Sequence, residues 1–263
     1  MARIVVMSGS TTGMSGVGLA ALADSGRADI AAFILSRGQV LNRARFLRRK
    51  IRKFLFDVGP LGLIAGSRIR AILDVAAFAP HLPNALVTAE HHGIPVHVVQ
   101  AINSVETENL LRGLDARVGV SLGNGMIRPS VYSIPAHGTI NVHHGAVPEY
   151  RGGPPVFWEI HDGREEVGYT IHKLDRHTDS GDVLASGSVA LQYGSTLTET
   201  MRSTLLELYR SSAAALVDVV ADIENLAQHA RKQDRPGFNT TPTLWQFIAG
   251  ARRCRRMTAR RSL

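Results

Sequence analysis

The sequence contains little cysteine and few aromatic residues. Cys254 is its only cysteine, which excludes an intrachain disulfide and a cysteine-rich metal site and is typical of a reducing compartment. Aromatic residues make up 6% of the chain, whereas hydrophobic residues make up 44% and charged residues 20%. This composition is ordinary for a globular protein. A chain of 263 residues is also long enough to bury one sizeable core.

Long apolar runs are also missing, because none reaches the roughly 18 residues that a membrane-spanning helix needs. The first ten residues, MARIVVMSGS, lack the apolar segment and the small-residue cleavage site of a signal peptide. They predict a first strand and a glycine turn instead. We therefore expect a cytoplasmic protein, with a peripheral membrane location as the alternative.

Acidic residues are absent from two strongly basic segments. Residues 37–53 hold eight Lys and Arg residues, and residues 250–263 hold six Arg residues. Without these fourteen, 16 basic and 22 acidic residues remain, so a net charge of +8 becomes −6. The high overall charge therefore does not indicate that the whole protein binds nucleic acid.

The first basic segment carries an apolar stripe at helical spacing. It predicts an amphipathic helix within a basic helical insertion over about residues 37–80. Such a helix can lie in solvent, on an anionic membrane or against RNA phosphate, and the last two alternatives also apply to residues 250–263. The residues of the stripe are Leu47, Ile51, Phe54, Leu55 and Val58.

Short apolar runs alternate with helical patterns from residue 2 to about residue 145. The run from Ala116 to Leu122 is almost continuous, as in a buried parallel strand. The alternation predicts an α/β fold with a Rossmann-like, open and mostly parallel sheet and helices on both faces. Two later runs, Glu166 to Leu174 and Asp182 to Leu191, extend this sheet. Ligands of such sheets bind beyond the carboxyl ends of the strands.

A long amphipathic pattern from Ser195 to about Asp222 predicts the last helix of this unit. We therefore assign residues 1–222 to one domain. Residues 223–263 are rich in proline, glycine and arginine. They predict an irregular basic tail that packs through Phe238 and Trp245.

A glycine- and hydroxyl-rich segment, SGSTTGMSGVG, runs from Ser8 to Gly18. It follows the first predicted strand and begins a helical pattern, where backbone N–H groups can bind an anion. Ser10 is therefore a candidate phosphate ligand, although a plain turn between strand and helix explains the segment equally well. The spacing matches neither a dinucleotide fingerprint nor a P-loop, which argues against a dehydrogenase.

The candidate chemistry lies at the end of a β-branched run. Asn141 and His143 are two residues apart and therefore lie on the same side of the predicted strand. Asp179 lies in a polar turn after the next predicted strand, so an amide, an imidazole and a carboxylate can converge. Acyl transfer to an amine needs hydrogen-bond donors for an oxyanion and an acceptor for the amine proton. These three side chains can supply both.

Three motifs follow one another in this region. They are Asn141-x-His143, Pro148-x-Tyr150-Arg151-Gly152 and Asp175-x-x-x-Asp179-Ser180-Gly181-Asp182. Together they resemble the signature of the N10-formyltetrahydrofolate-dependent formyltransferases. The resemblance implies Asn141, His143 and Asp179 as catalytic residues of a domain over residues 1–222. It also implies direct transfer of the formyl group from N10-formyltetrahydrofolate, without an acylated residue.

The same resemblance implies binding residues around these three side chains. The expected folate pocket consists of Leu122, Gly123, Asn124, Gly125, Met126, Ile127, Asp175, Thr178 and Gly181. The expected substrate ligands are Ser10, Tyr150, Arg151 and Gly152, although Arg151 also fits an ordinary surface arginine. No metal is expected, because nearby histidines match no zinc spacing, namely His137, His161, His172 and His177.

The acceptor remains open at this point. No pattern of a second domain follows residue 222, so we expect a small-molecule amine, first of all a nucleotide-linked amino sugar. Glycinamide ribonucleotide and an RNA-bound amine such as Met-tRNA are the alternatives. A non-catalytic protein that binds folate or a membrane is the alternative of another class. Homodimer formation is also left open.

Overall fold

The computed structural model describes residues 1–38, 48, 61–234 and 237–261. Within them a seven-stranded sheet forms the middle layer, in the order β3-β2-β1-β4-β5-β6-β7. The first five strands along the chain pair in parallel, and β6 and β7 pair antiparallel. The strands are β1 (Ala2–Ser8), β2 (Ala28–Ser36), β3 (Val96–Val99), β4 (Val118–Leu122), β5 (Thr139–His143), β6 (Glu166–Lys173) and β7 (Val183–Ala190). The predicted α/β class and mostly parallel sheet are confirmed.

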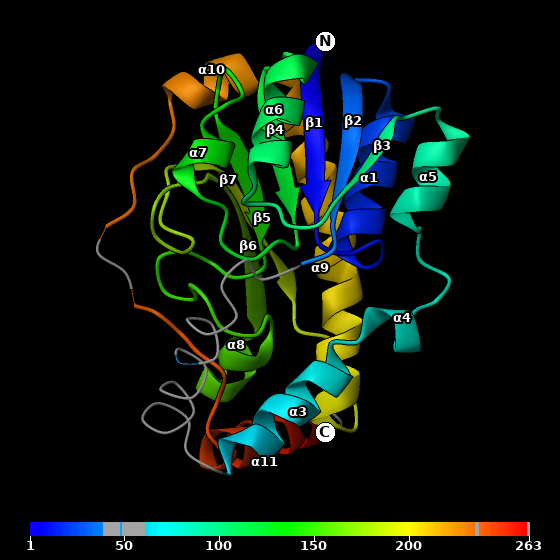
Figure 1. Cartoon of the computed structure of the whole chain (residues 1–263). Coiled ribbons are helices and arrows are strands. Elements are labelled where there is room, and N and C mark those ends of the chain that lie inside the picture. The colour runs from blue at the N-terminus through cyan, green and yellow to red at the C-terminus, as the bar shows by residue number, and fades with distance from the viewer. Residues whose placement is uncertain (39–47, 49–60, 235–236, 262–263) are drawn as a thin grey trace.

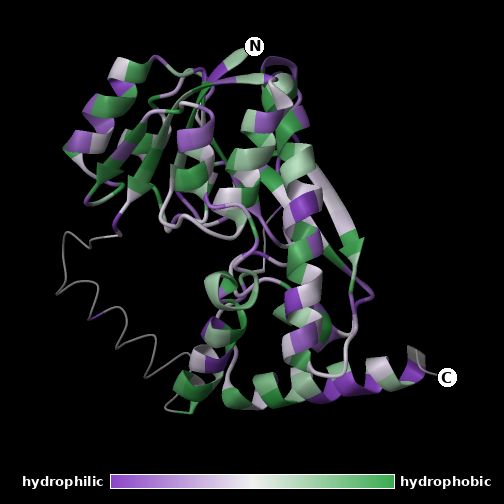
Figure 2. Cartoon of the chain, turned by 90° about the vertical axis from the view of Figure 1, so that its right-hand side faces the viewer, coloured by the Kyte–Doolittle hydropathy of each residue, from purple (hydrophilic) through white to green (hydrophobic). Residues whose placement is uncertain are grey.

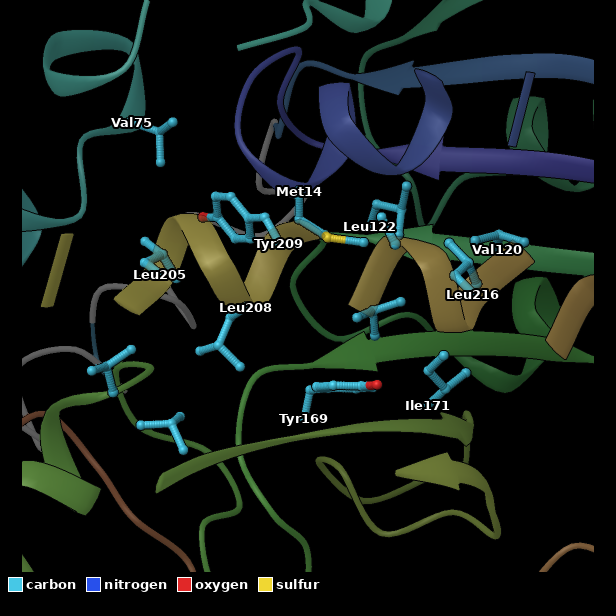
Figure 3. Packing of buried hydrophobic residues seen from close by; sticks show 14 of the residues in the cluster. Met14, Val75, Val120, Leu122, Tyr169, Ile171, Leu205, Leu208, Tyr209 and Leu216 are labelled. Atoms are coloured by element: carbon cyan, nitrogen blue, oxygen red, sulfur yellow. The ribbon is translucent and has the colours of Figure 1, made fainter. Parts of the chain in front are cut away.

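Helices cover both faces of this sheet (Figure 1). The larger core lies between the sheet and α1 and α9, and a smaller core lies beneath α6 and α7. Figure 3 shows part of the larger core, where Tyr209 and Leu216 of α9 pack with Leu122 of β4 and Ile171 of β6. The helices are α1 (Met14–Ser25), α3 (Gly62–Ile72), α4 (Val75–Phe78), α5 (Ala85–His91), α6 (Val105–Leu114), α7 (Pro129–Tyr132), α8 (Phe157–Asp162), α9 (Leu197–Ala221), α10 (Ile223–Gln228) and α11 (Leu244–Arg261).

The predicted basic insertion is described only in part. The apolar stripe from Leu47 to Val58 lies outside the described residues. The rest forms two helices, α3 and α4, with Leu73 and Asp74 between them. No helix in the described ranges combines the length and the apolar character that a membrane crossing requires.

The expectation of an irregular tail after residue 222 is wrong for most of that segment. α10 continues from α9, and α11 forms an 18-residue helix that packs against α8 and the first turns of α9 (Figure 2). Phe247 stacks on Phe157 with ring centroids 6.2 Å apart, and Cys254 is fully buried. The expected anchors are exposed instead, Phe238 by 58% and Trp245 by 73%.

The buried face of α11 explains why its sequence does not show a hydrophobic stripe. Phe247, Gly250 and Cys254 are buried and Thr258 is half-buried, at a helical spacing of three or four residues. Only the first of these side chains is large and apolar. Arg252, Arg253, Arg255, Arg256 and Arg260 occupy exposed positions, so the segment has the composition of a basic tail although one face is packed.

We predict that Phe247→Ala destabilises the protein by about 3 kcal/mol, because it removes a buried aromatic ring from the contact between α11 and α8. Trp245→Ala is the matched control on the same helix. Its ring is largely exposed, so the expected change is within about 0.5 kcal/mol. Urea unfolding followed by circular dichroism measures both values. Equal effects of the two substitutions would contradict this assignment of the packed face.

A buried carboxyl group lies on α8. Glu159 is 2% exposed, and its Oε1 atom has no hydrogen-bond partner among the residues that the structure describes. Burial raises the pKa of Glu159 to about 8, and the neighbouring Asp162 acts in the same direction. The group is therefore mostly protonated in the folded protein at neutral pH.

This raised pKa predicts a loss of stability with rising pH. The stabilising contribution of protonated Glu159 is complete below 4.5, its ordinary pKa, and is lost as the pH rises towards 8. Between pH 5 and pH 8, the free energy of unfolding of the wild type should fall relative to that of Glu159→Gln by on the order of 3 kcal/mol. Urea unfolding at both pH values tests this, with the exposed Glu90→Gln as control. Parallel pH profiles of the wild type and Glu159→Gln would contradict the raised pKa of Glu159 in the folded protein.

Candidate active site

A cavity of about 360 Å³ lies beyond the carboxyl ends of β4 and β5. Its walls come from the turn after β4, the end of β5, the loop 152–155 and the polar turn 174–179. Asn141 and His143 of β5 and Asp179 of the polar turn all line it. The structure therefore brings together the three side chains that the sequence predicts to act together.

Asp179 is the central acceptor of this site. Its Oδ2 atom accepts a hydrogen bond from the Gly152 N–H at 3.1 Å and lies 3.4 Å from His143 Nδ1. Its Oδ1 atom lies 3.6 Å from His172 Nε2. Burial alone would raise the pKa of Asp179, but His172, His143 and the Gly152 N–H outweigh burial and hold it at about 2. The carboxylate is thus ionised at any physiological pH.

His143 has a defined orientation between two acceptors. Its Nε2 atom lies 2.8 Å from the Tyr150 carbonyl oxygen, so this nitrogen carries the hydrogen. Its Nδ1 atom faces Asp179. Burial lowers the pKa of His143, and the opposing effects of Asp179 and the Tyr150 carbonyl only partly offset this. The neutral ring can therefore take up a proton at Nδ1, where the carboxylate stabilises the resulting charge.

His172 is a site residue that the sequence analysis did not select. It is fully buried on β6, where it pairs with Asn141 across the antiparallel ladder. Its Nδ1–H donates to the Lys173 carbonyl at 2.9 Å, which leaves Nε2 facing Asn141 Nδ2 at 3.5 Å and Asp179 Oδ1. No local pattern of the sequence reveals this residue, because its place opposite Asn141 depends on the register of the antiparallel pair.

His144 points away from these groups. Its Nε2 atom lies 3.2 Å from the Ser212 hydroxyl of α9, and its ring packs on Tyr209. Burial lowers the pKa of His144 to about 3, so the ring is neutral. The neighbouring histidines of β5 thus differ in role, because successive strand residues face opposite sides.

The predicted binding residues divide into two groups. Those that line the cavity are Gly123, Asn124, Gly125, Met126, Ile127, Gly152, Asp175 and Thr178. Those that do not are Ser10, Leu122, Tyr150, Arg151 and Gly181.

Arg151 and Tyr150 contact protein groups next to the cavity instead. Arg151 is only 6% exposed, and its guanidinium donates through Nε and Nη2 to the Thr178 carbonyl oxygen. The Tyr150 hydroxyl donates to Asp162, while its carbonyl holds His143. Arg151 is therefore neither an exposed surface arginine nor turned towards the cavity. It joins the loop 149–153 to the polar turn.

The segment around Ser10 is bonded to itself. The Ser8 and Ser15 hydroxyls lie 2.5 Å apart and both donate to the Leu122 carbonyl oxygen, and the Ser10 N–H donates to Ser8 Oγ. These contacts favour the plain turn between β1 and α1 over a phosphate site.

The turn after β4 is held by two asparagines. Asn124 Nδ2 donates to the Met7 carbonyl at 2.7 Å, and Asn103 donates to the Met126 carbonyl and accepts from the Arg128 N–H. Asn103 is a second residue that the sequence analysis missed. Between these anchors, nothing lies within 4 Å of the Cβ position of Gly125, so its backbone is open to a ligand.

This arrangement can support acyl transfer. Asn141 lines the cavity, and its side-chain amide can donate a hydrogen bond to an oxyanion there. His143 and Asp179 together can accept a proton from an attacking amine. No group of three His, Cys, Asp or Glu side chains within the described part of the chain is placed to hold a metal ion.

The family model described as formyl transferase matches residues 2–216. The chain therefore belongs to the formyl transferase family. It is 32% identical over 151 residues to the methionyl-tRNA formyltransferase of Ehrlichia ruminantium (strain Welgevonden), covering 57% of this chain and 48% of that protein. It is 37% identical over 110 residues to that of Geobacter metallireducens, covering 41% of this chain and 35% of that protein. The chain thus spans about half or less of the length of these curated relatives.

Solved structures show the same fold. A phosphoribosylglycinamide formyltransferase from Anaplasma phagocytophilum has a TM-score of 0.55 at 18% identity, covering 84% of this chain and 88% of that one. An N-formyltransferase from Helicobacter canadensis, in complex with folinic acid and dTDP-3-aminofucose, has a TM-score of 0.55 at 14% identity, covering 97% and 81%. The Rossmann-like formyltransferase fold expected from the sequence is confirmed.

The site geometry predicts large losses of activity on substitution. Asn141→Ala removes an oxyanion donor and should lower kcat by about 10²- to 10³-fold. His143→Ala and Asp179→Asn remove the proton acceptor or its charge and should lower kcat by about 10²- to 10⁴-fold. Steady-state kinetics with a formyl donor and an accepted amine measures these effects.

Two controls accompany these variants. His137→Ala changes a histidine outside the cavity, near Arg117 and Glu224, and should keep wild-type kcat. Thermal unfolding should show a folded protein in each case. Wild-type turnover by His143→Ala would remove this residue from the chemistry.

Proposed function

We propose that this protein transfers the formyl group of N10-formyltetrahydrofolate to a primary amine of a small molecule, most of all a nucleotide-linked amino sugar. The observation that carries the proposal is the meeting of Asn141, His143 and Asp179 in one cavity at the carboxyl ends of β4 and β5. The family membership supplies the reaction class.

The reaction balances with these residues. The amine nitrogen attacks the formyl carbon, and its lone pair forms the new C–N bond. The oxygen becomes an oxyanion, which the Asn141 amide stabilises. The proton lost by the amine passes to His143 Nδ1 beside Asp179. The oxyanion then re-forms the carbonyl as the bond between the formyl carbon and N10 breaks. N10 takes the proton held by His143, and tetrahydrofolate leaves.

The turn after β4 supports the folate part of this proposal. Its residues Gly123, Gly125 and Met126 line the cavity and offer main-chain N–H and C=O groups. A flat heterocycle with donors and acceptors along its edge can pair with such groups. The exposed Met126 side chain adds an apolar surface at the rim, since it is 62% exposed.

A second and larger cavity supports a bulky acceptor. It measures about 1340 Å³ and adjoins the first at Gly153, which lines both. Its walls are α3 and residues 238–241. Phe238 offers a ring for a base, Arg70 a cation for a phosphate, and Thr241 a hydroxyl for sugar hydroxyls. A nucleotide-linked amino sugar carries all three kinds of group.

The extent of the fold likeness agrees with this choice. The structures of N-formyltransferases from Helicobacter canadensis and Shewanella sp FDAARGOS_354, the latter described as a sugar N-formyltransferase, each cover 97% of this chain. The phosphoribosylglycinamide enzyme covers 84%. The likeness to the former thus extends over more of this chain.

An RNA-bound amine is the second candidate, and the basic face of α11 favours it. Arg252, Arg253, Arg255, Arg256 and Arg260 are all exposed on this helix. Such a row of cations can bind a polyanion, whether RNA or an anionic membrane. The curated relatives named above are methionyl-tRNA formyltransferases.

A formyl-transfer assay tests the proposal. N10-formyltetrahydrofolate is offered with nucleotide-linked amino sugars, glycinamide ribonucleotide or Met-tRNA, and tetrahydrofolate release is followed. We expect release with an amino sugar. We also expect Phe238→Ala to raise the KM of that acceptor about 10-fold, because a base loses its stacking surface.

The matched control for Phe238→Ala is Trp245→Ala, which changes another exposed aromatic residue outside the cavities and should leave KM unchanged. Release with Met-tRNA alone, at a rate that falls steeply with added salt, would favour the second candidate. Folate binding without transfer to any amine would refute the acceptor classes proposed here.

A further inference from the structure

The chain between α10 and α11 crosses both loops that build the catalytic site. We call its described residues, 231–234 and 237–241, the strap. It lies beyond residue 216, where the match to the formyl transferase family ends. Arg231 begins it by pairing with Val183 of β7 through two backbone hydrogen bonds of 2.8 and 2.9 Å. The strap is thus fixed to the sheet just after the turn that carries Asp179.

Gln233 contacts the backbone of that turn. Its Nε2 atom donates to the Asp179 carbonyl at 3.2 Å and to the Gly181 carbonyl at 2.6 Å. Carbonyl oxygens only accept hydrogen bonds, so these two contacts fix the orientation of the amide. Asp179 has a φ of 50°, in the left-handed region that non-glycine residues rarely adopt. Such a conformation persists only when surrounding contacts hold it.

Asn239 contacts the other loop. Its backbone N–H donates to the Arg151 carbonyl at 2.8 Å, and its Nδ2 atom donates to the Glu149 carbonyl at 3.2 Å. A bridge also joins Asn239 to Gly152. Gly152 is the residue whose N–H binds the Asp179 carboxylate. The strap therefore holds both partners of this hydrogen bond, the Asp179 turn through the Gln233 side chain and the Gly152 loop through the backbone and side chain of Asn239.

The close approach of the strap explains the glycine at position 152. Its φ is 64°, and a Cβ atom there would lie 2.6 Å from Phe238 Cε2 and 2.7 Å from the Asn239 carbonyl oxygen. Neither distance is tolerated between real atoms. The loop can thus lie against the strap only with glycine at this position.

We propose that Gln233 and Asn239 are positioning residues, which hold the two loops so that the Asp179 carboxylate faces His143 and His172. The inference rests on the proposed function for its kinetic consequence, but its structural consequence does not depend on catalysis. Neither residue touches the cavity that holds Asn141, His143 and Asp179. Both act through the groups that they bind.

A packing role and a hydrogen-bonding role make different predictions for Gln233. Gln233→Met keeps the length and bulk of the side chain but removes both hydrogen bonds. The Gln233 Oε1 atom is buried without a partner in the described part of the chain, so its loss leaves no other group unpaired. Packing alone would therefore be rescued by methionine, whereas positioning of the turn would not.

The first readout is the titration of His143, followed by NMR on protein labelled with ¹⁵N at histidine. The groups that face its ring are Asp179, His172, Arg151 and the Tyr150 carbonyl, and Asp179 raises its pKa. In Gln233→Met the carboxylate is displaced, so we expect the midpoint of His143 to move to lower pH. Lys232→Met, at the exposed neighbouring position, is the matched control and should titrate like the wild type.

The second readout is kinetic. We expect Gln233→Met to lower kcat by about 10²-fold, as small displacements of catalytic groups do, with little change in the KM of the acceptor. Asn239→Ala should act in the same direction through the Gly152 side, and thermal unfolding shows whether each variant is folded. If Gln233→Met fails to fold, Asn239→Ala carries the same two readouts.

The outcomes separate the two proposals. An unchanged His143 titration in folded Gln233→Met and Asn239→Ala would overturn the positioning role, whatever the reaction. A shifted titration in a protein that transfers no formyl group would keep the positioning role and reject the proposed function. A wild-type kcat in Gln233→Met would show that Gln233 contributes only packing and that its hydrogen bonds do not position the turn.

Discussion

The buried carboxylate of Asp179 is the interaction on which the site depends. Transfer of a charge into a protein interior is costly unless the charge is paired and hydrogen-bonded. Here two imidazoles and one backbone N–H surround it and hold its pKa at about 2. These partners come from β5, β6 and the loop after β5. A single ionised group therefore fixes the relative positions of β5, the loop after it and β6.

The sheet provides this arrangement by changing direction at β5. Up to that strand the pairing is parallel, and the carboxyl ends of β4 and β5 open on one edge. β6 then runs antiparallel, which places His172 opposite Asn141 and ends the strand beside the start of β5, where Lys173 pairs with Ile140. The polar turn that follows lines the cavity. Asp179 follows within that turn.

The sequence predicts the parts of this site that depend on local rules. Strand alternation places Asn141 and His143 together, and the ordered motifs identify Asp179. His172 depends on the register of an antiparallel pair, which no local pattern gives. Arg151 suggests a substrate ligand because it lies in the second motif, yet its guanidinium donates to the Thr178 carbonyl. The helix α11 is missed because its packed face contains Gly250 and Cys254, which carry little hydrophobic signal.

The loop 149–153 supports the site although none of its side chains lines the catalytic cavity as a reacting group. The Tyr150 carbonyl orients His143, the Arg151 guanidinium holds the turn at Thr178, and the Gly152 N–H binds Asp179. Two of these contacts use backbone groups, and the third uses the Arg151 side chain. Gly152 is constrained twice, because its N–H is bound on one side and the strap lies against its Cα on the other. The chemistry therefore requires the backbone path of this loop, and the path in turn requires these residue types.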